Sequence, residues 1–390
     1  RAGMRVVPPE QAGLQQFVLD LLSQGTEKYT NEQFAQLLED RAISFGVSLA
    51  PDYSQVTITA VRDDFDVALE ALNQVLFAAT FPEEEVEQER TQLVNAARAS
   101  ALRVFDPVYD AARKAIYGPG GYGAPSAGLP EAYQALLRDD LMNFYHRFYI
   151  PNNITLVLVG DFNADEAVEK IKAATASQAA GELPPEIGAL GALTTPQLAE
   201  TQTIQQERQM GTVFQVLAWP APPVSRVQEY VALKLVNYVV GGAPLSASRL
   251  FFEIRERRGL AYATASIYPT RQDISAFVAY AQTDPGPDAQ QTYDLILQVV
   301  QDMGQTPLTE RQLREAKDGV IGAFALDQET NAERAFFLGL FELSGAGYEL
   351  VDQYIDLVEG LTSEEVQAVA QQVFSQPYVR VALGPPGALQ

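Results

Sequence analysis

The sequence contains no cysteine and a single histidine among its 390 residues. Disulfides, thiolate zinc sites and cysteine nucleophiles are therefore excluded. Because His146 stands alone, no site that needs two histidines can be built from this chain, and a Ser-His-Asp triad would have to use His146. We expect His146, in the aromatic stretch NFYHRFYIPNN, to be a packing or capping residue.

Long apolar runs and basic clusters are also missing. No run of 18 apolar residues occurs, so the sequence predicts no membrane span. The 27 basic residues are outnumbered by 50 acidic ones, which gives a net charge of −23. Only Arg255, Arg257 and Arg258 cluster, and this argues against a nucleic-acid-binding surface. The acidic balance favours basic or cationic partners, or serves solubility alone. The composition is typical of a soluble protein, and we leave its compartment open between a bacterial cytoplasm and periplasm.

Two copies of one α+β unit account for most of the chain. Residues 288–326 repeat the helix, breaker and long helix of 66–104, and 360–384 repeat the helix and strand of 136–160. We therefore predict two homologous domains, each a sheet covered by helices. The domains are expected at 1–175 and 198–390, on either side of an Ala-, Gly- and Pro-rich linker at 176–197.

Within the first half, apolar periodicity and breakers predict the individual elements. We expect helices, strands and one loop at these places: a helix over 32–45 closed by Gly46, a strand over 54–61, a mobile glycine-rich surface loop over 117–128, a helix over 130–149 and a buried strand over 153–161.

The stretch AGLQQFVLDLLSQGT, residues 12–26, predicts a helix with two faces. Leu14, Phe17, Val18, Leu21 and Leu22 form one apolar stripe, which indicates a core-facing side. The remaining Gln16, Leu19 and Asp20 follow the i, i+3, i+4 spacing and are expected to share one patch on the opposite side. An ordinary solvated face is the simplest interpretation of this patch.

Several stretches together resemble the pitrilysin/insulinase-type metallopeptidases, a family that includes the mitochondrial processing peptidases. They are SRLFFEIRERRGLAYATASIYP (248–269), AGLQQFVLDLLSQGT, FPEEEVEQER with its following helix, and FYIPNNITLVLVGDF. The resemblance implies a processing-peptidase-like fold of two homologous α+β domains. Relatives usually have a strand or two before the first helix, so we expect this chain to begin part-way into its first domain.

Catalytic relatives carry H-x-x-E-H on the first helix, and the resemblance places its three functional positions on Gln16, Leu19 and Asp20. The third ligand of these relatives, a Glu from the long helix, falls on Ala96. Gln16 is a poor ligand, Leu19 cannot take a proton from water, and Ala96 offers no ligand atom. The resemblance therefore implies a degenerate zinc site, with no metal or cofactor in this chain.

The second half retains Arg255 and Tyr262, seven residues apart in RERRGLAY. In the family, an Arg and a Tyr at this spacing bind the substrate backbone and help to stabilise the oxyanion. A weaker candidate is Gly241-Gly242, in the region of a glycine-rich loop tied to substrate handling in processing peptidases. A turn that needs positive φ is the preferred interpretation of these two glycines.

These features lead to one hypothesis and its alternatives. The chain is expected to be the non-catalytic subunit of a heterodimeric zinc peptidase, inactive on its own, which binds extended peptide and completes the active site of an H-x-x-E-H-bearing partner with Arg255 and Tyr262. The alternative is a structural or peptide-binding scaffold, as a homodimer or a core-protein-like component, with no peptidase role. An enzyme with a different site is the third possibility, and no motif supports it.

Overall fold

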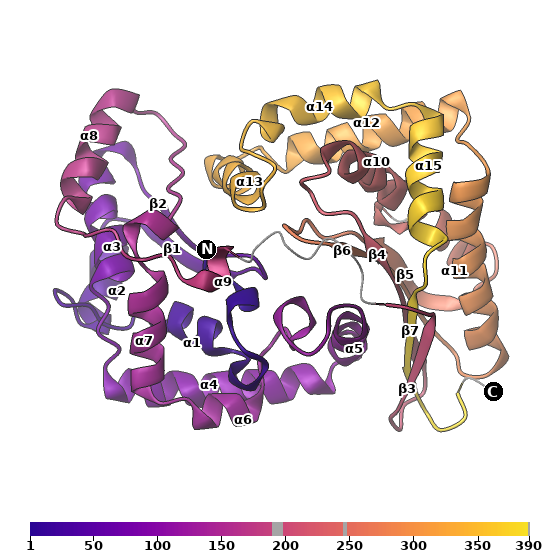
Figure 1. Ribbon diagram of the computed structural model, residues 1–390, viewed down its shortest axis with the longest axis horizontal. Helices are drawn as coiled ribbons and strands as arrows, with labels where there is room; N and C mark the ends of the chain where they lie inside the picture. The colour runs from indigo at the N-terminus through magenta and orange to yellow at the C-terminus, as the bar shows by residue number, and fades with distance from the viewer. Residues whose placement is uncertain (189–197, 245–247, 389–390) are drawn as a thin grey trace. The chain divides into compact units, whose positions relative to one another are not determined.

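The computed structural model describes residues 1–188, 198–244 and 248–388, which form two compact units. Unit 1 comprises residues 1–101, 120–190 and 330–339, and unit 2 comprises the rest of the chain. The chain therefore has an α+β fold built of two units, as the repeat predicts (Figure 1).

Unit 1 is built around the helix α1 (Leu14–Leu21). A hairpin of two antiparallel strands, β1 (Ser44–Leu49) and β2 (Ser54–Thr59), packs beside it. Helix α2 (Asn31–Glu39) begins at a capping box in which Thr30 and Gln33 satisfy each other's backbone N–H groups. The prediction that one helix runs over 32–45 is therefore wrong in its second part, because the chain leaves the helix after Glu39 and enters β1.

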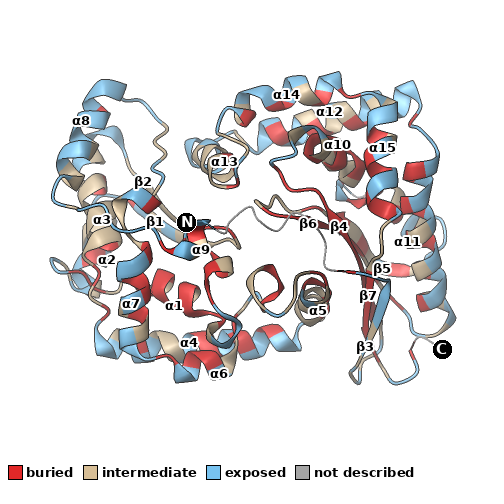
Figure 2. Ribbon diagram, in the orientation of Figure 1, coloured by how far each residue is buried: buried red, intermediate tan, exposed pale blue. Residues whose placement is uncertain are grey.

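The other helices of unit 1 lie outside this centre, and their outer faces are exposed in Figure 2. The long α4 starts with Glu83, Glu84 and Glu85, whose charges favour the positive end of the helix dipole. The helices are α3 (Phe65–Phe77), α4 (Glu83–Leu102), α6 (Pro130–Ala135), α7 (Arg138–Phe148), α8 (Ala164–Thr175) and the short α9 (Pro185–Gly188). The helix predicted over 130–149 is thus two helices, because Leu136 and Leu137 adopt extended backbone angles.

The strand predicted over 153–161 does not form. Residues 154–159 are extended but belong to no strand, and Leu156 is 45% exposed. Their repeat in unit 2 is the strand β7 (Val379–Gly384), which pairs with β3 (Gln202–Glu207) and β4 (Val213–Ala221). In the described part of unit 1, no strand pairs with residues 154–159.

The glycine-rich segment 117–128 is not the mobile surface loop that its composition predicts. Tyr122, in a 3-10 turn (Gly121–Gly123), is only 4% exposed and donates a hydrogen bond to the buried Asp52. The guanidinium of Arg5 lies 4.8 Å from the centre of the Tyr122 ring. An aromatic anchor, which glycine counts do not reveal, holds the segment in place.

Unit 2 contains a five-stranded sheet in the order β3-β7-β4-β6-β5. Its outer strands are β3 (Gln202–Glu207), parallel to β7, and β5 (Ala261–Ile267), antiparallel to β6 (Ser275–Thr283). The central β4 (Val213–Ala221) is buried along its whole length, because both faces of the sheet are covered. One face is covered by α5 (Phe105–Tyr117), and α10 (Val227–Asn237), α11 (Pro287–Gln305) and α15 (Ser363–Phe374) cover the other (Figure 1).

The remaining helices of unit 2 are α12 (Glu310–Leu326) and α14 (Leu350–Gly360), and two π-helical turns, η6 (Tyr238–Gly242) and η8 (Phe251–Glu256), follow α10. Most of α13 (Asn331–Leu343) belongs to unit 1. Residues 102–119 pack in unit 2, whereas the sequence assigns them to the first domain. Of the predicted linker 176–197, residues 189–197 lie outside the described residues.

Candidate functional site

Helix α1 presents a much narrower polar face than its sequence predicts. Leu19 is fully buried and belongs to the core of unit 1, so the prediction that it shares an outer patch with Gln16 and Asp20 is wrong. Gln15 is buried as well, at 3% exposure. A helix at the centre of a unit is covered on nearly all sides, and on α1 only a thin strip around Gln16 and Asp20 stays partly open.

Gln16 and Asp20 are bound to each other. The Nε2 atom of Gln16 donates to both carboxylate oxygens of Asp20, each at 2.8 Å. Burial raises the pKa of Asp20, and the hydrogen bond from Gln16 opposes this shift in part. The two side chains that would replace the first and second zinc ligands therefore satisfy one another.

Two further residues, which the sequence analysis does not identify, interact with Asp20. Burial and, in second place, the charge of Asp20 raise the pKa of Glu89 on α4. Tyr133 on α6 packs its ring against Phe17, 6.0 Å between centres, and its pKa is also raised by burial and then by Asp20 and Glu89. In the sequence, Glu89 is marked only as a carboxylate on the same helix as Ala96, about two helical turns before it.

The arrangement does not fit a zinc ion. Ala96 is exposed on α4 and has no ligand atom, and Leu19 fills the place of the general base with an aliphatic side chain. Over residues 1–188, 198–244 and 248–388, no group of three or more His, Cys, Asp or Glu side chains lies together in a way that could hold a metal ion. Asp20 and Glu89 supply only two carboxylates, and the neutral amide of Gln16 is not one of the usual zinc ligands, so the three-ligand site that zinc catalysis requires is incomplete.

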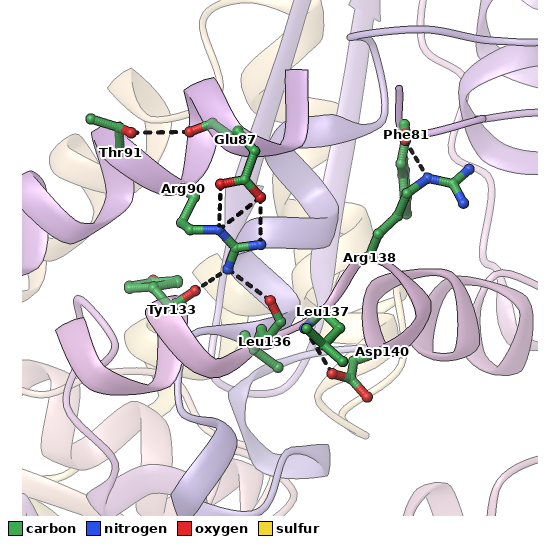
Figure 3. Close-up of polar contacts among 9 residues, drawn as sticks. All are labelled: Phe81, Glu87, Arg90, Thr91, Tyr133, Leu136, Leu137, Arg138 and Asp140. Carbon is green, nitrogen blue, oxygen red and sulfur yellow. Dashed lines mark hydrogen bonds and ion pairs between the residues drawn. The ribbon is translucent and has the colours of Figure 1, made fainter. Parts of the chain in front are cut away.

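Arg90, next to Glu89, fixes α4 to its neighbours. Its guanidinium donates to the carbonyl oxygens of Tyr133 and Leu136 and pairs with Glu87 at 3.1 Å (Figure 3). The same group lies 5.3 Å from the ring centre of Phe17 on α1. Charge-assisted hydrogen bonds thus hold α4 to the end of α6, and the contact with the Phe17 ring brings in α1.

Unit 2 brings Arg255 and Tyr262 into contact. Arg255, at the end of η8, donates from Nη1 to the backbone carbonyl oxygen of Tyr262 at 2.7 Å, and it stacks on Phe251 at 5.4 Å. The Tyr262 hydroxyl donates to Asp284 at 3.0 Å, and this hydrogen bond raises the pKa of Tyr262. Both side chains are exposed, Tyr262 at 57%, and the phenol stays in its neutral, donating form.

A β-bulge explains the exposure of Tyr262. Ala261 pairs with Thr283 and Ala263 with Gln282, so Tyr262 is the extra residue between two successive pairs. A bulge leaves the inserted residue outside the ladder and turns its side chain, and bulges are frequent next to active sites. The carbonyl freed in this way is the one that accepts from Arg255.

Gly241 and Gly242 lie in η6, and neither has the positive φ that the sequence interpretation requires. Close packing is the reason for both glycines. A Cβ on Gly241 would lie 2.4 Å from the backbone N of Ser266 in β5, and a Cβ on Gly242 would lie 2.3 Å from the side chain of Asn237. Gly241 therefore allows η6 to approach the strand that carries Tyr262.

His146 lies in the last turn of α7 and is exposed, with its ring 5.4 Å from that of Tyr145. It is not a packed core residue, and the capping interpretation stays a prediction. None of the described helices has the length and apolarity needed to cross a membrane.

Two family models match the chain. The model described as insulinase (peptidase family M16) matches residues 1–116, and the model described as peptidase M16 inactive domain matches residues 135–320. The boundary between the two matches falls after α5 and before α7.

Individual relatives agree with these matches. The chain is 23% identical to the uncharacterized zinc protease YmxG of Bacillus subtilis over 385 residues, which cover 99% of this chain and 91% of the relative. It is 24% identical to the non-peptidase homolog YmxG of Helicobacter pylori over 348 residues, 87% of this chain and 78% of the relative. Among solved structures, a peptidase M16 inactive domain from Pseudomonas fluorescens superimposes with a TM-score of 0.88 at 21% identity, covering 100% of this chain and 92% of that one.

Proposed function

Since the chain belongs to the insulinase-type (M16) metallopeptidase family, as a member that lacks the zinc-binding residues, we propose that it is the non-catalytic, peptide-binding subunit of a heterodimeric zinc peptidase. Zinc is assigned to a partner subunit that carries H-x-x-E-H. In this proposal Arg255 and Tyr262 of the present chain complete the partner's active site.

The observation that carries the proposal is the bulge at Tyr262. The metal position of α1 is filled by Leu19 and by the Gln16–Asp20 pair, whereas Tyr262 and Arg255 remain exposed and held in place. A phenol that faces outward from a bulged strand is placed where a ligand can reach it. Arg255 uses one Nη1 hydrogen bond for Tyr262 and has further N–H donors for a peptide carbonyl.

The position of β5 supports the binding of an extended peptide. It is an edge strand that pairs only with β6 in the described part of the sheet. A peptide can add to such an edge through main-chain hydrogen bonds, with alternate side chains on either side. A carbonyl of that peptide near Tyr262 would receive a hydrogen bond from the phenol, which now donates to Asp284.

The test is reconstitution with the H-x-x-E-H homologue encoded in the same genome. We expect Tyr262→Phe and Arg255→Ala each to lower turnover of a peptide substrate by at least about ten-fold, since single oxyanion donors contribute that much or more. Arg314→Ala, an exposed arginine on α12, is the control and should leave turnover unchanged.

Unchanged turnover in both Tyr262→Phe and Arg255→Ala would refute the role of this pair. Stoichiometric zinc in the purified chain would refute the assignment of the metal to a partner. A stable homodimer that ignores the homologue in a pull-down would favour the scaffold function instead, which the name non-peptidase homolog of the Helicobacter pylori relative also suits.

A further inference from the structure

A second candidate site lies within unit 2, between η6, the helical stretch at 248–258, α11 and α12. It is a pocket of about 720 Å³, and neither Arg255 nor Tyr262 lines it. Pockets of about 300–1,000 Å³ are typical of small-ligand sites. The pocket therefore needs an explanation separate from the proposed peptidase role.

Four arginines line this pocket, although the chain carries a net charge of −23. Arg257 and Arg258 both pair with Glu253, and Arg311 lies 3.6 Å from Glu315. These three are at least partly neutralised by their own neighbours.

The fourth arginine, Arg249, makes no such ion pair in the described part of the chain. It is half-buried, and its side chain makes no hydrogen bond to a described residue. Burial lowers its pKa, and the charge of Asp302, which also lines the pocket, opposes this shift in part. A guanidinium remains protonated even so, and a partly desolvated cation that donates no hydrogen bond is only partly compensated by a nearby charge. An anion in the pocket would relieve this.

Part of the pocket lining is apolar. Leu295 and Val299 of α11 and Ala316 of α12 line it and are almost fully buried, while Phe252, which also lines it, is 53% exposed. A ligand that uses both Arg249 and this apolar part joins an anionic group to an apolar body over a short distance. A residue at the end of a peptide chain does so, since its carboxylate and its side chain share one Cα.

We propose that this pocket binds the C-terminal residue of a peptide, with the free carboxylate at Arg249 and an apolar side chain on Leu295 and Val299. The net charge of the chain favours this ligand over polyanions, because a strongly negative protein repels ligands of high negative charge. A single terminal carboxylate on an otherwise neutral or basic peptide meets little repulsion. The site needs no partner subunit, so its test is independent of the proposed peptidase complex.

The experiment is calorimetric titration of the full chain with three probes: N-acetyl-Ala-Ala-Leu as the free acid, the same peptide as its C-terminal amide, and inorganic phosphate. We expect the acid to bind at least about ten-fold more tightly than the amide or phosphate, as the loss of a charge-assisted hydrogen bond implies. Equal binding of acid and amide, equal binding of phosphate, or no binding of the acid would overturn the proposal.

Substitutions of single arginines then test whether the peptide carboxylate binds at Arg249. Arg249→Gln should weaken binding of the acid by at least about ten-fold and leave the amide unaffected. Because Arg249 is half-buried, Arg311→Gln, whose side chain is 80% exposed, provides a second variant that keeps the fold and should weaken the acid to a smaller degree. Arg314→Gln removes the same charge from the same helix outside the pocket and is the control. Acid binding that is unchanged in Arg249→Gln, or weakened equally in Arg314→Gln, would refute this placement.

Discussion

The structural role of Leu19 can be tested by the substitution Leu19→Glu, which places a carboxylate at this position. Leu19 is fully buried in the core of unit 1, among other hydrophobic side chains. Leu19→Glu loses the burial of an aliphatic side chain, about 2–3 kcal/mol, and buries a carboxyl group without a partner, about 1–3 kcal/mol more. We therefore expect a loss of about 3–6 kcal/mol in the free energy of unfolding of unit 1, a large part of the stability of a typical domain.

The pH dependence separates charge from shape. A buried glutamate has a raised pKa, so the folded state binds more protons than the unfolded state between the ordinary glutamate pKa of about 4.3 and the raised value. The destabilisation by Leu19→Glu should therefore grow as the pH rises through this window, while that of Leu19→Gln stays constant.

The measurement is urea unfolding followed by circular dichroism, with hydrogen exchange of α1 to assign the loss to unit 1. Trp219 fluorescence is unsuitable, because the only tryptophan lies on β4 in unit 2. The matched control is Leu137→Glu, the same substitution at a side chain that is 66% exposed. If Leu19→Glu unfolds like Leu137→Glu, then Leu19 faces an open site and our account of α1 is wrong.

Three further predictions concern unit 2 and the proposed complex. Lys234 donates to the carbonyl of Tyr268 at 2.8 Å, and its burial lowers its pKa to about 8. The unfolded lysine binds its proton up to a higher pH than the folded one. The free energy of unfolding of the wild type, measured in urea, should therefore rise by about 2 kcal/mol relative to that of Lys234→Met between about pH 7.5 and 9.5. Gly241→Ala should lower the free energy of unfolding by about 1–3 kcal/mol through overpacking against Ser266, whereas Gly322→Ala on α12, where a Cβ meets nothing within 4 Å, should be neutral or slightly stabilising in the same thermal melts. In the proposed complex, basic peptides should be cleaved faster than acidic ones at low salt, and this preference should fade at high salt; rates that do not depend on peptide charge would contradict a role for the −23 charge.

The predicted helices form with different bounds and the strand predicted over 54–61 forms as β2, whereas the strand predicted over 153–161 is missing, and the repeat shows why. Residues 154–159 and β7 have the same apolar character, but only β7 has neighbours on both sides, β3 and β4. A helix closes its hydrogen bonds within its own segment, whereas a strand requires a partner that the local sequence does not contain. Periodicity alone therefore cannot tell a central strand from an unpaired extended segment.

The site was predictable to a different degree in each half. The spacing of Arg255 and Tyr262 suffices to bring them together, since η8 and β5 are joined by a short turn. The bulge at Tyr262 could not be predicted, because it is defined by the pairing of Ala261 and Ala263 with β6. Glu89 was missed for a similar reason: its relation to Asp20 depends on how α4 packs against α1.

Gln16 and Asp20, the two residues that the family resemblance places at metal-ligand positions, compensate one another, and this bears on where chemistry can occur. A carboxylate left half-buried after the loss of a metal would lack a partner for its oxygens, at a cost of about 1–3 kcal/mol. Asp20 avoids this cost, because Gln16 lies one helical turn away and donates to both oxygens. Leu19, which lies between them in the sequence, is buried in the core. On α1, Gln16 and Asp20 therefore bind each other, and the rest of the helix is buried. Replacing either residue by a zinc ligand would break their hydrogen bonds without creating a zinc site. If the proposed complex cleaves peptides, the metal and the general base must both come from the partner.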